Sequence, residues 1–384
     1  MLLPASRECS SVISCSLILI QELRRLRTAA APDDSCALRR PANHVSNPPG
    51  EFQLIERLLK RLGPGRRTIL GPGDDCAILP AARARQLLTI DSMVEDVHFK
   101  LAWGTPERLG ARALTVNLSD IAAMGGKPTV CVVNLAVREG LDMRFFDRMY
   151  RGLSAAANGC EVEVVGGNVT RASALAITIA LLGEVRGAAL RRDAGRPGDT
   201  VYVTGTLGDA AAGLRILSGR LRAHGAARRF LVDRYLRPAA RLKAGLRLAR
   251  IKPAPAAIDV SDGLWQDLGH ILERSGVGAE IDASALPLSA AYRATVGDDP
   301  ALALGGGDDY ELLFCLRHAL SARALTRSLG VRVSHIGRIT SSGKAVLVNG
   351  AVPSDSTLVN ARGSLRASSS PLTGWDQLRS RPGT

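Results

Sequence analysis

Five groups of acidic side chains, each beside glycine or serine, are the residues of this sequence whose types and spacing could do chemistry. They are Gly73-Asp74-Asp75, Asp91, Asn117-Leu118-Ser119-Asp120, Asp259-Val260-Ser261-Asp262-Gly263 and Gly306 to Glu311. Carboxylate oxygens are ligands that Mg²⁺ prefers, and carboxylate-bound Mg²⁺ usually completes its coordination with water and substrate phosphates. The pattern therefore predicts an enzyme that handles nucleotides.

Each acidic group also has a structural interpretation. Asp74 and Asp75 lie in a glycine-rich turn, where they could be solvated turn residues or ligands. Asp120 lies in an otherwise apolar helical stretch, so its charge needs either an arginine or a metal, and the sequence slightly favours the arginine. Asp259 and Asp262 follow a short apolar strand, and capping of the next helix explains one of them but not both.

The familiar signatures of phosphate chemistry are missing from the sequence. It has no Gly-x-x-x-x-Gly-Lys-Ser/Thr loop, no His-Arg-Asp set of protein kinases and no His-Glu-x-x-His zinc motif. His98 follows the acidic Asp91, and a histidine in such a place is more often an ordinary hydrogen-bonding residue than a functional one. If ATP binds, Mg²⁺ and arginines must neutralise its phosphates.

The elements that position the acidic groups are predicted from hydrophobic periodicity. Strand-like runs occur at 86–91, 130–137, 161–165, 175–185, 200–204, 256–260, 277–282, 310–315, 333–339 and 345–348. Helix-like runs occur at 52–62, 107–124, 143–157, 208–218, 228–249 and 263–275. The acidic groups fall where strands end and loops or helices begin, which is where ligands gather in α/β proteins.

The order of these elements predicts a mixed α/β fold in two domains. We expect an N-terminal domain at 51–192 and a C-terminal domain at 193–376, because the turn-rich Arg196-Pro197-Gly198-Asp199 separates two series of strands and helices. Residues 1–50 are expected to be an extension that is disordered or not translated, with a linker rich in proline and serine before Glu51. Residues 377–384 are expected to be a tail.

Composition narrows the class of protein without identifying it. The formal net charge is +14, but only six of the 50 basic residues are lysine, and no dense basic run with interleaved aromatic residues favours nucleic-acid binding. Seven cysteines form no Cys-x-x-Cys pair, so a zinc site or a disulfide framework is not indicated, and a reducing cytoplasm fits best. The apolar segment Val12–Ile20 is too short to span a bilayer.

Eight segments occur in an order that is specific in combination. They are Glu51-Phe52, Gly73 to Ala77, Asp91 with Val94 to Phe99, Val116 to Gly125, Gly166 to Arg171, Asp259 to Leu264, Gly306 to Leu312 and Gly374-Trp375-Asp376. Over roughly residues 51–376 they resemble the thiamine-monophosphate kinase family. The resemblance implies the architecture of the aminoimidazole-ribonucleotide-synthetase-like superfamily, with an N-terminal α/β domain that dimerises through its sheet and a C-terminal α/β domain that closes the ATP site.

The resemblance also implies roles for particular residues. The Mg²⁺ ligands would come from Asp75, Thr89, Ile90, Asp91, Asp120, Asn168, Asp259 and Asp262, with Asp120 and Asp262 as catalytic residues. Residues that bind ATP would be Gly167, Asn168, Arg192 and Ser261. The substrate pocket would be lined by His98, Asp308 and Trp375, whose aromatic ring suits a cationic heterocycle.

Three positions depart from the family's usual pattern. Asn168 replaces an aspartate and removes one negative charge, so one Mg²⁺ is expected to bind more weakly. Ile90 replaces a threonine and could offer only its backbone carbonyl. Asp308 replaces a glutamate, so its contact with substrate could need a water.

The implied reaction is transfer of a phosphoryl group from ATP to thiamine monophosphate, with thiamine diphosphate and ADP as products. The acceptor phosphate is already an anionic nucleophile, so in-line transfer assisted by several Mg²⁺ ions needs no general base. A homodimer is implied, and a monovalent cation is a further candidate cofactor; no nucleic-acid or membrane partner is expected. The alternatives are another ATP-dependent synthetase of the same superfamily and a non-catalytic basic protein that binds nucleotide or nucleic acid.

Overall fold

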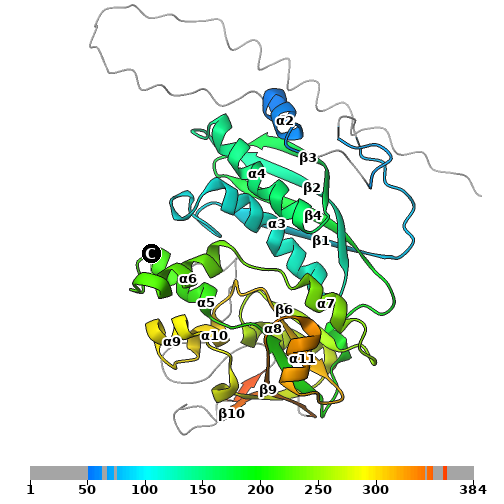
Figure 1. The fold of residues 1–384 in the computed structure, drawn as a ribbon, viewed down its shortest axis with the longest axis vertical. Helices are drawn as coiled ribbons and strands as arrows, with labels where there is room; N and C mark the ends of the chain where they lie inside the picture. The colour runs from blue at the N-terminus through cyan, green and yellow to red at the C-terminus, as the bar shows by residue number, and fades with distance from the viewer. Residues whose placement is uncertain (1–50, 63–66, 73–75, 342–343, 349–357, 361–384) are drawn as a thin grey trace, which may run out of the picture. The chain divides into compact units, whose positions relative to one another are not determined.

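Two β-sheets with helices packed on them make up the part of the chain that the structure describes (Figure 1). The structure is a computed structural model, and it describes residues 51–62, 67–72, 76–341, 344–348 and 358–360. These residues belong to one compact unit of the chain. The predicted extension 1–50, the predicted tail 377–384, and the candidate residues Asp75 and Trp375 lie outside the described residues.

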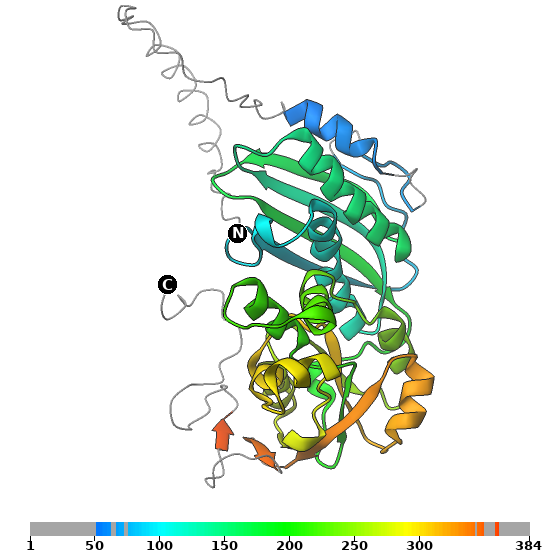
Figure 2. The same cartoon turned by 60° about the vertical axis from the view of Figure 1, so that its left-hand side comes forward.

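The first sheet has four strands in the order β1-β4-β2-β3. The strands are β1 (Arg85–Val94), β2 (Lys127–Val137), β3 (Glu163–Arg171) and β4 (Ala176–Val185). β4 pairs antiparallel with β1 and β2, whereas β2 and β3 are parallel. Helices α3 (Pro106–Ala123) and α4 (Met143–Gly159) lie across one face of this sheet (Figures 1 and 2), and α2 (Glu51–Leu59) packs on α4.

Helix α3 starts where the sequence supplies a cap. The Thr105 hydroxyl accepts a hydrogen bond from the Arg108 backbone N–H at 3.4 Å, and Pro106 occupies the first helical turn, where no intrahelical N–H is needed. The helix ends at Ala123, with Met124 as its C-cap and Gly125 after it in the left-handed conformation. Its burial is unusually complete for a surface helix, because it contacts elements of both sheets.

The second sheet has seven strands in the order β11-β10-β7-β9-β5-β8-β6. The strands are β5 (Thr200–Thr204), β6 (Ala256–Val260), β7 (Gly278–Asp282), β8 (Glu311–Leu316), β9 (Val333–Thr340), β10 (Lys344–Val348) and β11 (Leu358–Asn360). Its helices are α5 (Asp209–Leu217), α6 (Gly225–Leu236), α7 (Leu242–Leu248), α8 (Leu264–Ser275), α9 (Ala290–Val296), α10 (Ala301–Gly305) and α11 (Ala322–Leu329). Short 3-10 turns are η2 (Leu101–Trp103), η3 (Arg192–Ala194) and η4 (Ala283–Ala285).

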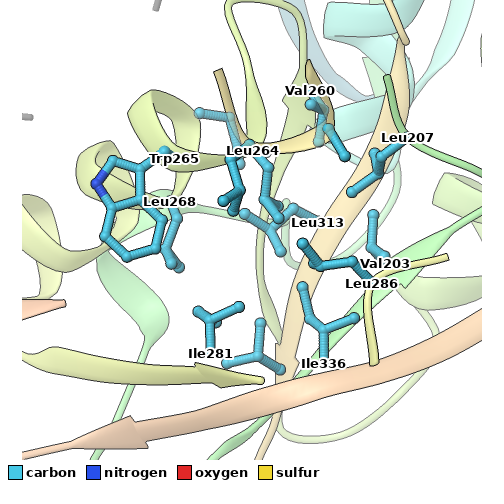
Figure 3. Packing of buried hydrophobic residues seen from close by; sticks show 14 of the residues in the cluster. Val203, Leu207, Val260, Leu264, Trp265, Leu268, Ile281, Leu286, Leu313 and Ile336 are labelled. Atoms are coloured by element: carbon cyan, nitrogen blue, oxygen red, sulfur yellow. The ribbon is translucent and has the colours of Figure 1, made fainter. Parts of the chain in front are cut away.

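A dense apolar core packs the start of α8 against the second sheet, in which β6 is an edge strand. Leu264 and Leu268 from α8 pack with Val260, Leu313 and Ile336 from the strands (Figure 3). Because Val260 lies within the Asp259 to Gly263 segment and Leu264 directly follows it, this core fixes the loop that carries the acidic residues.

Most of the predicted elements are present, and one prediction is wrong. The mixed α/β class is confirmed, and the strands predicted at 200–204 and 256–260 have these bounds in the structure. The single helix predicted at 228–249 is instead two helices, α6 and α7. The break contains Pro238, which cannot donate an intrahelical hydrogen bond and disfavours helical backbone in the residue before it.

Candidate active site

Asp91 and Asp120 bring the first two acidic segments of the sequence together. Thr89 and Asp91 lie on the face of β1 that α3 covers, and the Thr89 hydroxyl donates a hydrogen bond to Asp120 Oδ2 at 2.5 Å. Loss of solvent, together with the charges of Asp120 and Asp262, raises the pKa of Asp91 to about 6. Because the Asp91 residue is exposed, we attribute its raised pKa chiefly to repulsion by the carboxylates of Asp120 and Asp262.

Asp259 joins this group from the second sheet. It is the penultimate residue of β6, a strand whose residues are all buried, and it is itself only 3% exposed. The hydroxyl of Ser119, next to Asp120 on α3, donates a hydrogen bond to Asp259 Oδ2 at 2.7 Å. Burial and then the charge of Asp120 raise the pKa of Asp259 to about 7. The acidic segments that carry Asp120 and Asp259 are therefore neighbours in space.

The loop from Ser261 to Gly263 is shaped by an aspartate that the sequence reasoning did not single out. Asp267, 2% exposed in the first turn of α8, accepts hydrogen bonds from the backbone N–H groups of residues 261, 262 and 263 at 3.0, 3.1 and 3.2 Å. Burial and the charges of Asp259 and Asp262 raise the pKa of Asp267 well above its usual value. An acidic residue in the first turn of the following helix was the available signal.

Asp91, Asp120, Asp259 and Asp262 form what we call the carboxylate cluster. Burial raises the pKa of Asp120, whereas the Thr89 hydrogen bond and the charge of Arg192 lower it. Arg192 also acts on Asp259, although its own side chain is exposed on η3. The arginine and metal interpretations of Asp120 are therefore both compatible with its surroundings.

The donor set of the carboxylate cluster suits a hard cation such as Mg²⁺. Its members are oxygen ligands whose ionised forms repel one another, so a bound cation would stabilise them. Within the described ranges, no three or more histidine, cysteine, aspartate or glutamate side chains are already grouped as a metal site. The residues present fit the ion chemically, and a shift of side chains would have to accompany its binding.

Two other candidates, Gly167 and Asn168, lie away from the cluster, and a third, Ile90, points its side chain away from it. Asn168 is on β3, at the opposite edge of the first sheet from β1, about 14 Å away at the usual strand spacing, and its side-chain amide donates to Asn134 Oδ1 at 2.9 Å. Gly167 is its neighbour, and a Cβ there would lie 2.1 Å from the Val133 carbonyl oxygen. Ile90 points its side chain to the uncovered face of the sheet with 65% exposure, so only its backbone could serve the site.

The two described substrate candidates are connected through Arg112 on α3. Arg112 Nη2 donates to Asp308 Oδ1 at 2.8 Å, and Nη1 lies 3.5 Å from the His98 carbonyl oxygen. The Tyr235 hydroxyl donates to the same His98 carbonyl oxygen at 2.8 Å, while the His98 ring accepts at Nδ1 from the Val94 backbone N–H at 3.0 Å. Arg112 was not predicted, since its role depends on a contact between distant segments.

An apolar pocket of about 170 Å³ adjoins Arg112. Its walls come from η2, the first turns of α3, and α6, and they include Phe99, Trp103 and Tyr235. Arg112 lines this pocket and also contacts Asp308, so its guanidinium lies between the pocket and that carboxylate. The pocket is large enough for part of an organic ligand.

A second acidic group lies beside the Asp308 segment and is compensated by arginines. Glu311 is fully buried and accepts hydrogen bonds from Arg234 Nη2 at 3.0 Å, Arg241 Nε at 2.6 Å and the Thr204 hydroxyl at 2.7 Å. Asp209 and Asp309 are also buried, and the charge of Arg234 acts on both. We call this set the ion-pair cluster; its members are Asp209, Arg234, Arg241, Asp309 and Glu311.

Comparison with known proteins defines first the class of the protein. Residues 73–185 match the family described as AIR synthase related protein, N-terminal domain, and residues 196–349 match AIR synthase related protein, C-terminal domain. The first sheet lies within the first matched range, and all strands of the second sheet except β11 lie within the second, which agrees with the architecture that the resemblance implied.

Full-length relatives then identify the family. The chain is 41% identical over 292 residues to the thiamine-monophosphate kinase of Salmonella typhimurium, covering 73% of this chain and 86% of that protein. It matches the crystal structure of thiamine-monophosphate kinase from Stenotrophomonas maltophilia at 38% identity and a TM-score of 0.68, covering 78% and 96% of the two chains. The protein belongs to the thiamine-monophosphate kinase family and is a kinase.

One solved relative carries small molecules. The structure of AaThiL complexed with AMPPCP and TMP is 33% identical, with a TM-score of 0.63, and the match covers 80% of this chain and 95% of that chain.

No helix in the described ranges has the length and apolar run needed to cross a bilayer.

Proposed function

We propose that this enzyme transfers the γ-phosphoryl group of ATP to the phosphate of thiamine monophosphate, forming thiamine diphosphate and ADP. The family relatives named as thiamine-monophosphate kinases support the acceptor, and the AaThiL complex with AMPPCP and TMP supports the pair of ligands. The observation in this chain that carries the proposal is the meeting of Asp120 and Asp259 through Ser119, which puts a carboxylate of α3 beside a carboxylate of the second sheet.

The chain's own residues would organise two polyanions for reaction. The carboxylate cluster would hold Mg²⁺, which when bound would neutralise phosphate charge. Arg192 adds a cation beside the cluster, and Asp267 holds the loop of Ser261 and Asp262 by three backbone hydrogen bonds. The acceptor phosphate oxygen is anionic at neutral pH, so no side chain has to remove a proton before in-line attack.

The remaining site assignments belong to the same proposal. Asp75 would complete the ligand set, and His98, Asp308 and Trp375 would bind the thiamine part of the substrate. Gly167 and Asn168 would contact ATP only if ligand binding or a second subunit brings them near the carboxylate cluster, because in one chain they lie across the sheet. We also retain 51–192 and 193–376 as the domain boundaries, and the matched family ranges support a division between them.

We propose a homodimer formed through the uncovered face of the first sheet. Leu88, Ile90 and Val132 are 73%, 65% and 42% exposed there, and apolar side chains grouped in this way mark interaction surfaces. Sedimentation of the wild type and of Leu88→Lys tests the dimer. The wild type is expected to be a dimer and the variant a monomer, and a wild-type monomer would contradict the proposal.

The described cysteines Cys76, Cys131, Cys160 and Cys315 are free, which supports a reducing cytoplasm.

The activity is tested with the full-length chain, ATP, Mg²⁺ and thiamine monophosphate. Thiamine diphosphate and ADP are measured separately, with free thiamine as the control acceptor. We expect equal amounts of both products from the monophosphate and none from thiamine. ADP without thiamine diphosphate would indicate another acceptor, and folded protein that forms no ADP would refute the kinase proposal.

A further inference from the structure

Arg112 is a buried cation that contacts three segments far apart in the sequence. Its side chain is 4% exposed on α3; it donates to Asp308, its guanidinium carbon lies 4.0 Å from the Tyr235 ring centroid, and one nitrogen lies beside the His98 carbonyl. Burial opposes the charge of Arg112, but Asp308 and the two nearby tyrosines hold its pKa above the ordinary value. Its Nε has no hydrogen-bond partner within the described ranges. The hydrogen bonds of the guanidinium group are therefore those that its two Nη atoms make.

The Asp308 carboxylate is aimed at Arg112 by a strained loop. Asp308 and Tyr310 both have positive φ, at 69° and 52°, a conformation that side-chain-bearing residues rarely adopt. Backbone hydrogen bonds hold them there, from the Asp308 N–H to the Ser261 carbonyl and from the Tyr310 N–H to the Val260 carbonyl, each at 2.8 Å. Strain of this kind persists where surrounding contacts impose it, and it is common where a side chain must be presented to a ligand.

The loop also requires a close approach to the carboxylate cluster. A Cβ at Gly307 would lie 2.3 Å from the carbonyl oxygen of Ser261, so only glycine fits. The Asp308 segment is therefore packed directly on the Ser261 to Gly263 loop. A change in where Asp308 points would alter how a substrate lies relative to the residues proposed to handle its phosphate.

Two donors converge on one oxygen of Asp308. Arg112 Nη2 and the Tyr310 hydroxyl both donate to Oδ1, at 2.8 and 3.1 Å. Within the described residues no donor is bonded to Oδ2, and the side chain is 27% exposed. The arrangement fixes the carboxylate and leaves an acceptor oxygen for a ligand.

We infer that Arg112 is a positioning residue for the organic part of the substrate: with Tyr310 it holds Asp308 Oδ1 so that Oδ2 accepts a hydrogen bond from an N–H donor on a heterocycle. This inference rests on the proposed function. Because Arg112 offsets the charge of Asp308, the carboxylate acts as an oriented acceptor rather than as a free counter-ion.

The test compares the Michaelis constants of the full-length enzyme for its two substrates. Arg112→Met keeps most of the packing and removes the donors, and we expect the KM for thiamine monophosphate to rise about tenfold, which is the effect of one charged hydrogen bond. The KM for ATP is expected to stay within about twofold. Arg112→Lys should recover part of the loss, and Tyr310→Phe, which is nearly isosteric, should raise the same KM about threefold.

Arg148→Met is the matched control. Arg148 also joins a carboxylate, donating to both oxygens of Glu107 at 2.7 and 2.9 Å, but this pair lies between α3 and α4 and is partly exposed. Its kinetic constants should match the wild type. If Arg112→Met does not fold, Arg112→Lys and Tyr310→Phe decide the question by the same comparison of KM values.

The outcomes separate this inference from the proposed function. An active wild type whose KM for thiamine monophosphate is unchanged in the Arg112 and Tyr310 variants, or changes equally for both substrates, would overturn the role of Arg112 alone. A folded wild type that forms no thiamine diphosphate would overturn both proposals. A selective rise in the KM for thiamine monophosphate, partly recovered by lysine, supports the inference.

Discussion

The carboxylate cluster and the ion-pair cluster gather acidic side chains in the same molecule, but their charge is compensated differently. In the ion-pair cluster two arginines donate directly to the buried Glu311. In the carboxylate cluster, burial and nearby carboxylates raise the pKa values of Asp91 and Asp259, and Arg192, the cation that acts on Asp120 and Asp259, is exposed. The protein itself neutralises the charge of the ion-pair cluster, whereas the carboxylate cluster keeps negative charge that a bound cation can neutralise.

The largest expected effect comes from removing one charge of the carboxylate cluster. Asp120→Asn should lower kcat about 100-fold or more, because phosphate neutralisation contributes several kcal/mol to the transition state. The melting temperature should be unchanged or higher, since the asparagine can still accept from Thr89 and no longer repels Asp91 and Asp259. Steady-state kinetics and thermal unfolding are measured on one preparation; near-normal turnover would remove Asp120 from the ligand set.

In the ion-pair cluster we expect a substitution to lower stability. Glu311→Gln leaves Arg234 and Arg241 without their shared carboxylate, and it should lower the free energy of unfolding by about 3–5 kcal/mol. Guanidinium denaturation measures this change. Glu280→Gln, which breaks the exposed pair with Arg338, should lower it by less than about 1 kcal/mol. Equal effects in the two variants would show that the buried pairing of Glu311 is not structural.

The smallest effect concerns Asp309, the member of the ion-pair cluster with the least complete compensation. Burial raises its pKa to about 8, against the opposing effects of Arg234 and the Gly208 N–H. A carboxyl whose pKa is raised on folding stabilises the fold at low pH, and this contribution is lost as pH rises from about 4 to about 8. The denaturation midpoint of Asp309→Asn should therefore fall less between pH 5 and pH 8 than that of the wild type. Parallel pH dependences would contradict the raised pKa.

Much of the fold was predictable because its strands are short apolar runs with clear ends. The strand from Ala256 to Val260 is an example, since every residue in it is buried. The short helices α9, α10 and α11 were not predicted, because they have few turns in which an apolar stripe can appear. The break between α6 and α7 was missed although Pro238 signals it.

The site was predictable by residue type but not by contact. The sequence singled out Asp120 and Asp259, yet nothing local shows that Ser119 joins the two segments. Arg112 illustrates the limit most clearly, because an arginine within an apolar helix is as readily a surface residue as the partner of Asp308, which lies in a distant loop before β8. The position of Asn168 across the sheet likewise follows from strand order, which residue types do not reveal.

Helix α3 has one further consequence, for the time at which the enzyme becomes active during folding. It packs on the first sheet, and it also contacts α7, β6 and β8; a Cβ at Gly245 of α7 would lie only 2.0 Å from the Ala122 carbonyl oxygen. Contacts between segments so distant in the chain form late, because the long intervening loop must first be closed. A chain in which only the first sheet has folded would hold Asp91 and Asp120 without Asp259. Kinase activity would therefore appear only after the second sheet has packed on α3.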